Sequence, residues 1–122
     1  MYNETRGLVN KAVMCKNIKM ETSSEEEYKS QLEEQRHMYS WCLQNIGGYS
    51  KISADNKAEE FYRYEPESEK YRNLVFHDDA WHWAMLYLKG DQYWLKNPKL
   101  EKETKEYSKE YEIYISKHAE NT

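Results

Sequence analysis

The densest group of titratable side chains lies in the run His77-Asp78-Asp79-Ala80-Trp81-His82. Imidazole nitrogens and carboxylate oxygens are common protein ligands of zinc and other divalent metals. On a helix, Asp78 and Asp79 lie four and three residues before His82, so either carboxylate can share a face with that imidazole. One hypothesis is therefore a divalent metal held by His77, Asp78, Asp79 and His82, in a metal-binding protein or a metal-dependent hydrolase.

The same residues also have a structural interpretation, which we favour. Two adjacent aspartates before an apolar run are typical of a helix N-terminus, where a carboxylate accepts backbone N–H groups. His82 would then lie among Trp and Met side chains, with a ring nitrogen hydrogen-bonded to one of the aspartates. On this interpretation no cofactor is expected.

No other pattern indicates a common enzyme class. Cys15 and Cys42 fit neither a metal spacing nor a redox motif, so each is expected to be a small buried side chain. A Gly-x-Ser-x-Gly nucleophile elbow is missing from the sequence. We therefore expect a protein without catalytic activity, with the metal site as the alternative.

The residues around 24–46 predict a long helix with two different faces. Ser23 with Glu26, or Ser24 with Glu27, fits a capping box, and Gly47-Gly48 supplies the backbone freedom that ends a helix. With Tyr28 at 0°, the main apolar stripe covers roughly 0° to 60°, while His37 lies near about 180° and Glu34 near about 240°. The pair Glu34-x-x-His37 has the spacing of di-iron carboxylate bundles, but it faces away from this stripe.

Two large side chains lie on the same second face of that helix. Trp41 falls at roughly 220° and Met38 at roughly 280°. Either a second layer of the fold covers Met38 and Trp41, which we favour, or the two residues belong to a surface that binds a partner.

Tyrosine is unusually abundant, with 12 residues, and several lie on one predicted terminal helix, residues 98–118. Tyr107, Tyr111 and Tyr114 recur at helical spacing on it. Tyrosine offers a large contact area at low entropic cost and is enriched in protein interfaces. These three side chains are expected to dock the last helix, to bind a partner, or to do both.

Composition limits the remaining function classes. The 122 residues have room for one domain, residues 1–122, and carry a net charge of −4. No apolar run approaches the ~20 residues of a membrane span, and no secretory segment is recognised, so we expect a soluble, cytoplasmic protein with reduced cysteines.

The 14 Lys and 4 Arg of the sequence are compatible with an AT-rich bacterial or phage genome. Four cations lie near the N-terminus: Arg6, Lys11, Lys16 and Lys19. They are too few to indicate a nucleic-acid site.

The periodicities predict an all-α fold, a compact single-domain array of five to seven helices. Residues 80–88 are apolar on all sides and are expected to form the buried central helix. Ser53 is expected to cap a short helix and Pro66 to open another. Residues 5–20 are also expected to be helical. The alternative is an α+β fold with a small hairpin near residues 49–65.

From this aromatic surplus and the missing catalytic motifs we expect a protein-interaction module. Inhibitors, immunity proteins and regulatory subunits belong to this class. Its partner is expected to be another protein or a second copy of the chain.

Overall fold

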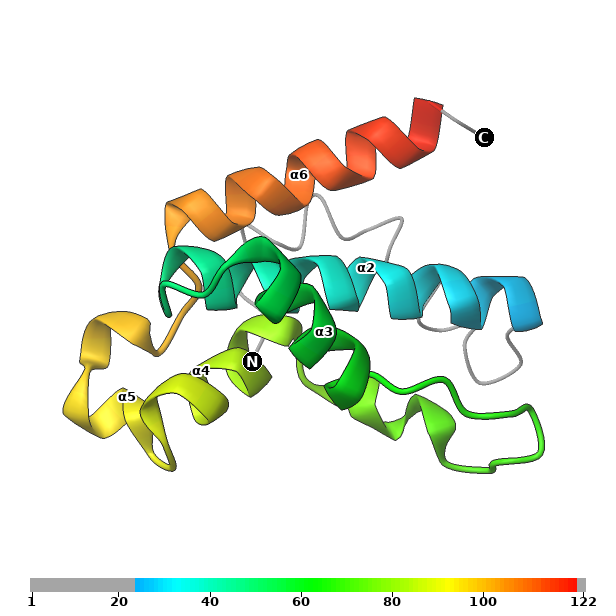
Figure 1. The fold of residues 1–122 in the computed structure, drawn as a ribbon, viewed down its shortest axis with the longest axis horizontal. Coiled ribbons are helices and arrows are strands. Elements are labelled where there is room, and N and C mark those ends of the chain that lie inside the picture. Colours follow the sequence, from blue (N-terminus) through cyan, green and yellow to red (C-terminus); the bar gives the residue numbers. More distant parts are fainter. Residues whose placement is uncertain (1–23, 121–122) are drawn as a thin grey trace.

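The computed structural model describes the backbone of residues 24–120 and the side chains of residues 24–118. This part of the chain contains helices and no strand, which confirms the all-α prediction (Figure 1). The hairpin proposed as an alternative near residues 49–65 is wrong, because α3 (Lys51–Phe61) occupies most of that stretch. The predicted helix at 5–20, with Cys15 and the four N-terminal cations, lies outside the described residues.

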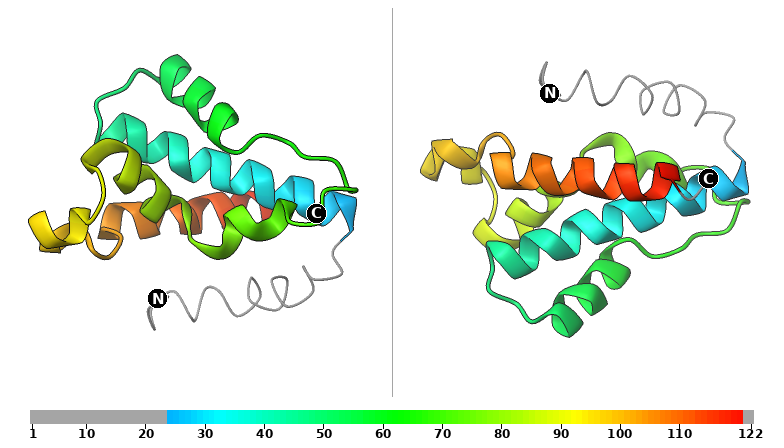
Figure 2. Two further views of the ribbon diagram at one scale, coloured as in Figure 1. Left: turned by 90° about the horizontal axis from the view of Figure 1, so that it is seen from below. Right: turned by 90° about the horizontal axis from the view of Figure 1, so that it is seen from above.

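The long helix α2 (Glu25–Asn45) is the element on which the others pack. The second of the two capping boxes that the sequence allows is formed: the Ser24 hydroxyl accepts the Glu27 N–H at 3.1 Å, and the Glu27 carboxylate accepts the Ser24 N–H at 2.9 Å. The helix ends just before Gly47 and Gly48, the second of which has a φ of +75°. Figure 1 shows α6 (Lys105–Glu120) above α2 and α4 (Ala80–Lys89) below it, and Figure 2 shows α3 on a third side.

The apolar helix α4 has the predicted bounds but a different place. Its inner face is buried, through Ala80, Trp81, Ala84 and Met85, whereas Tyr87 is 47% exposed. The central position belongs to α2, and among the described elements α4 packs mainly on α2 and α5 (Tyr93–Lys96). The prediction that α4 is covered on every side is therefore wrong for the described part of the chain.

Three helix starts differ from the sequence predictions. Ser50 caps α3 instead of Ser53, and its hydroxyl accepts the Ser53 N–H at 3.2 Å. Pro66 opens no α-helix; a 3₁₀ helix, η2 (Arg72–His77), forms further along. Pro98 begins only the short 3₁₀ helix η3 (Pro98–Leu100), after which α6 starts beside Thr104.

None of the helices in residues 24–120 combines the length and the hydrophobicity that a membrane crossing requires.

Candidate functional site

The four predicted metal ligands lie close in sequence, but each has a separate place in the structure. The Asp79 carboxylate caps α4 by accepting the His82 N–H at 3.0 Å, and it is only 7% exposed. His77 is exposed at the end of η2, and Asp78 follows it in extended backbone. Across the described residues, no group of three or more His, Cys, Asp or Glu side chains is placed to hold a metal ion. The geometry therefore does not support the metal-site hypothesis.

His82 belongs to an aromatic cluster between α4 and α5. Its Nδ1 lies 3.1 Å from the Tyr93 hydroxyl, and its ring lies 5.4 Å from Trp83 and 6.4 Å from Trp94. The expected carboxylate partner is thus replaced by a tyrosine. Burial, followed by the charges of Asp79 and Asp78, raises the pKa of Tyr93 to about 12, so this partner stays neutral near pH 7.

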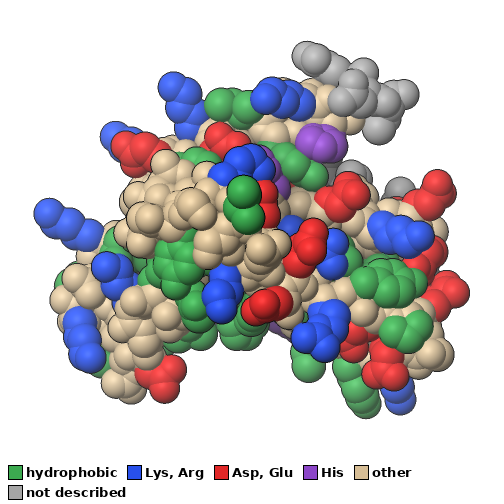
Figure 3. Space-filling view, viewed as in Figure 1, with side chains coloured by type: hydrophobic (Ala, Val, Ile, Leu, Met, Phe, Trp, Pro, Cys, Tyr) green, Lys and Arg blue, Asp and Glu red, His purple; other side chains and the backbone are tan. Residues whose placement is uncertain are grey.

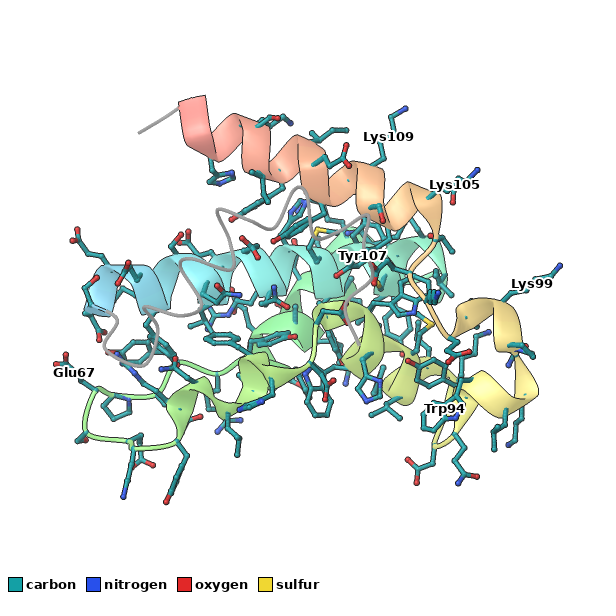
Figure 4. All side chains as sticks on the ribbon, turned by 180° about the vertical axis from the view of Figure 1, so that it is seen from behind. Glu67, Trp94, Lys99, Lys105, Tyr107 and Lys109 are labelled. Carbon is teal, nitrogen blue, oxygen red and sulfur yellow. The ribbon has the colours of Figure 1, made fainter. Side chains whose placement is uncertain are left out.

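The predicted interface residues form an internal contact between α2 and α6. Met38, Tyr107 and Tyr111 are at most 3% exposed, so they do not lie on a free surface. Trp41 is half-buried, and its ring lies 6.0 Å from that of Tyr107 in an edge-to-face arrangement. Helix α6 therefore supplies a second layer over Trp41, and Met38 is fully buried, so both residues have the internal burial that the sequence favoured. Figure 4 shows Tyr107 pointing from α6 towards α2, while Lys105 and Lys109 point away.

Polar contacts at the same junction fix how α6 lies on α2. The Tyr111 hydroxyl donates to Glu34 at 3.1 Å, and His37 Nε2 lies 2.7 Å from Glu110. Tyr114, half-buried, packs on the His37 ring with centroids 4.8 Å apart. Glu34 and His37 do face away from the main stripe of α2, as predicted, and they bind α6 there.

Four rings and one leucine side chain remain accessible beside α3 and α4, and we call this surface the aromatic face: Tyr49, Phe61, Trp83, Leu86 and Tyr87. Phe61 is 38% exposed and Tyr87 47% exposed, while the other three are half-buried. Trp83, Leu86 and Tyr87 share the outward side of α4, because they are three and four residues apart. Figure 3 shows hydrophobic side chains gathered over α4 and beside α3.

Two rings of the aromatic face, Trp83 and Phe61, are held by the fold beneath them. The Trp83 indole N–H donates to the carbonyls of Val75 at 3.0 Å and Asp78 at 3.2 Å. Phe61 stacks on buried Tyr39, with centroids 5.0 Å apart and an interplanar angle of 6°. Phe61 also contacts Trp83 within the aromatic face, with ring centroids 5.5 Å apart. The rings therefore need little ordering before they contact another molecule.

The aromatic face is uncharged. The Tyr49 hydroxyl donates to the Tyr87 hydroxyl at 3.2 Å, and this hydrogen bond raises the pKa of Tyr49. Below them, burial raises the pKa of Tyr39 to about 12. No Lys, Arg, Asp or Glu belongs to the five residues. Such a surface suits an apolar partner, and aromatic residues with few charges are typical of interface cores.

Sequence reasoning missed the aromatic face because it assigned all of residues 80–88 to the core. The i, i+4 pair Trp83 and Tyr87 carried a usable signal, since both side chains join an apolar body to a polar tip. What the sequence did not show is which side of α4 the other helices leave open.

The chain matches no protein-family model, no curated protein and no solved structure.

Proposed function

We propose that this protein is an interaction module that binds a protein partner through the aromatic face. The observation that carries the proposal is the outward side of α4, where Trp83, Leu86 and Tyr87 form an apolar surface that the described chain leaves accessible. A surface with several aligned rings is the kind of patch that marks a protein interaction site.

Preorganisation supports binding by this surface. Immobilising a flexible side chain at an interface costs about 0.5–1.5 kcal/mol, and the bonded Trp83 and the stacked Phe61 have lost this freedom already. Trp and Tyr are also the side chains that most often dominate interface energetics.

Charge supports a protein partner over a nucleic acid. Residues 24–122 contain 14 Lys and Arg against 20 Asp and Glu, so this part of the chain carries a net charge of −6. A negative protein repels a phosphate backbone, and the five residues of the face supply no cation to offset this. An inhibitor, an immunity protein or a regulatory subunit would use such a neutral surface to cover part of its partner.

Site-specific crosslinking tests the proposal. A photoreactive phenylalanine analogue replaces Tyr87 on the aromatic face or, as the control, Ile52, which is 76% exposed on α3 outside the face. We expect a discrete crosslinked partner from position 87 and none from position 52. The partner is then identified and purified, and its affinity is measured against variants.

With the purified partner, Tyr87→Lys should weaken binding at least about tenfold, as expected for a central interface tyrosine. Ile52→Lys adds the same charge outside the face and should leave the affinity unchanged. Equal losses in both variants would refute the assignment. If sedimentation shows self-association that Tyr87→Lys abolishes, the partner is a second copy and the proposal of a different protein fails.

A further inference from the structure

A second accessible apolar surface lies on η2 and the segment that precedes it, and we call it the ledge: Tyr64, Tyr71 and Leu74. Their side chains are 44%, 71% and 59% exposed. A 3₁₀ helix has about three residues per turn, so Tyr71 and Leu74 point to the same side of η2. The ledge does not include any residue of the aromatic face, and the inference below stands independently of the proposed function.

The ledge is held firmly although its side chains are exposed. Between Tyr71 and Leu74, Arg72 is 6% exposed, and its guanidinium binds the Glu25 carboxylate at 2.9 Å and the Glu65 carbonyl at 3.1 Å. The guanidinium also lies 3.8 Å from the centre of the Tyr28 ring. The Tyr64 hydroxyl donates to the same Glu25 carboxylate. Two large apolar side chains therefore point outward from a well-anchored turn.

Acidic residues outnumber basic ones in the segments around the ledge, and Lys70 Nζ lies over the Tyr71 ring, 5.6 Å from its centre. The first turn of α2 and the connection from α3 to η2 lie side by side, because Glu65 N–H donates to the Tyr28 hydroxyl at 3.1 Å. Together these segments contribute the carboxylates of Glu25, Glu26, Glu27, Glu65, Glu67 and Glu69, against the cations of Lys29, Arg63, Lys70 and Arg72. Figure 3 shows this grouping of red side chains at the right-hand end of the molecule. An occupant of the ledge should therefore be apolar on one side and basic on the other.

Residues 1–23 of the same chain have this chemistry. They contain four cations and two glutamates, so this segment has a net charge of +2. The last 23 residues of the sequence, in contrast, contain four lysines and six glutamates. The sequence predicts an apolar stripe through Leu8, Ala12 and Cys15. A helix over residues 5–20 would be about 24 Å long, enough to cover the turn that carries Tyr71 and Leu74.

The point of attachment favours the same occupant. Residue 23 joins Ser24, which caps α2, and the next residue, Glu25, already binds Tyr64 and Arg72. The segment therefore begins beside the ledge, and the short tether raises its local concentration there. We propose that residues 1–23 dock on the ledge of their own chain, with the apolar stripe over Tyr71 and Leu74 and the cations beside the glutamates.

Paramagnetic relaxation in the full-length chain tests this contact. A nitroxide is attached at Asn17→Cys, which belongs neither to the apolar stripe nor to the cations, in a Cys15→Ala background that keeps the stripe apolar; Cys42 is fully buried. We expect strong broadening of the amide signals of residues 71 and 74 and none at Ile113, on α6. Higher salt should reduce the broadening, because ion pairs at the surface are screened.

Matched variants separate the ledge from other surfaces. Tyr71→Ser with Leu74→Ser should abolish the broadening at the backbone of η2, while Ile52→Ser should leave it unchanged. Absence of broadening at residues 71 and 74 in the parent protein overturns the proposal, and so does broadening centred on Trp83 and Tyr87. Broadening in a mixture of isotope-labelled protein and separate spin-labelled protein would show docking between two copies, which also contradicts it.

Discussion

Gly47 shows how one residue sets the path of the chain out of α2. A Cβ at this position would lie 2.7 Å from the Leu88 side chain and 2.8 Å from the Leu43 carbonyl oxygen. Gly48 has open space around it, but its φ of +75° is unfavourable for other residues. Two adjacent glycines are therefore required for different reasons, one for close packing and one for backbone conformation.

We expect Gly47→Ala to lower the free energy of unfolding by about 1–3 kcal/mol, because the carbonyl cannot move without disturbing the end of α2. Urea denaturation measures the loss. Adding Leu88→Ala removes the side-chain part of the clash and leaves the contact with the carbonyl. If Gly47→Ala proves neutral, the backbone at this turn adapts more easily than its geometry indicates.

At the scale of elements, α6 depends on two buried tyrosines. The Tyr107 ring lies 5.4 Å from Trp81 and 6.0 Å from Trp41, so it joins α6 to both α4 and α2. The rest of the helix is largely polar and exposed. Amphipathic helices of this kind gain most of their stability from packing, not from intrinsic propensity.

Tyr107→Ala should therefore destabilise the protein by about 3–5 kcal/mol, as other large-to-small aromatic substitutions in cores do. Hydrogen exchange should rise first along α6. Ile113→Ala, at a side chain that is 40% exposed on the same helix, is the control and should change stability by less than about 0.5 kcal/mol. Uniform exchange changes across all helices would contradict a local role for Tyr107.

The elements that the sequence predicted well are those set by local signals. The capping box marks the start of α2, and the two glycines follow its end. Asp79 marks the start of α4, and Gly90 marks its end. At α3 the local signal was ambiguous, because Ser50 and Ser53 can both cap a helix. Pro66 failed as a helix start because the following segment is drawn to α2 by the Arg72–Glu25 ion pair, a contact between distant residues.

Candidate sites proved harder to predict than helices. Trp41 and Tyr107 are the same residue types as Trp83 and Tyr87, and both tryptophans are half-buried, but Tyr107 is 1% exposed whereas Tyr87 is 47% exposed. The difference lies in how α6 and α4 are arranged around α2, and periodicity along one helix does not contain this information. The prediction that one of the two adjacent aspartates caps α4 is confirmed for Asp79, because its hydrogen bond to the His82 N–H is local.

For the whole molecule, tyrosine burial determines stability at high pH. Burial is the leading cause that raises the pKa values of Tyr39, Tyr93 and Tyr114 to about 12, from a usual value of 10.0. The folded state therefore keeps protons that the unfolded chain releases. The resulting stability is complete below about pH 10 and is lost as the pH rises towards about 12.

Urea denaturation across this window should show a declining free energy of unfolding, in step with tyrosinate absorbance. Tyr39→Phe removes one buried hydroxyl and should make the decline less steep. Tyr71→Phe, at a side chain that is 71% exposed, should leave the slope unchanged. A slope that neither variant alters would assign the alkaline loss to other groups.

The hydrogen bonds of Trp83 connect α4 to η2 and to the residue that follows η2. Its indole N–H is shared between the Val75 carbonyl, within η2, and the Asp78 carbonyl, which follows η2. Leu74 immediately precedes one of these acceptors, and Tyr87 lies one turn beyond the donor. A single side chain thus braces two surfaces of the protein against each other, so a shift of η2 would be transmitted to the ring that a partner meets.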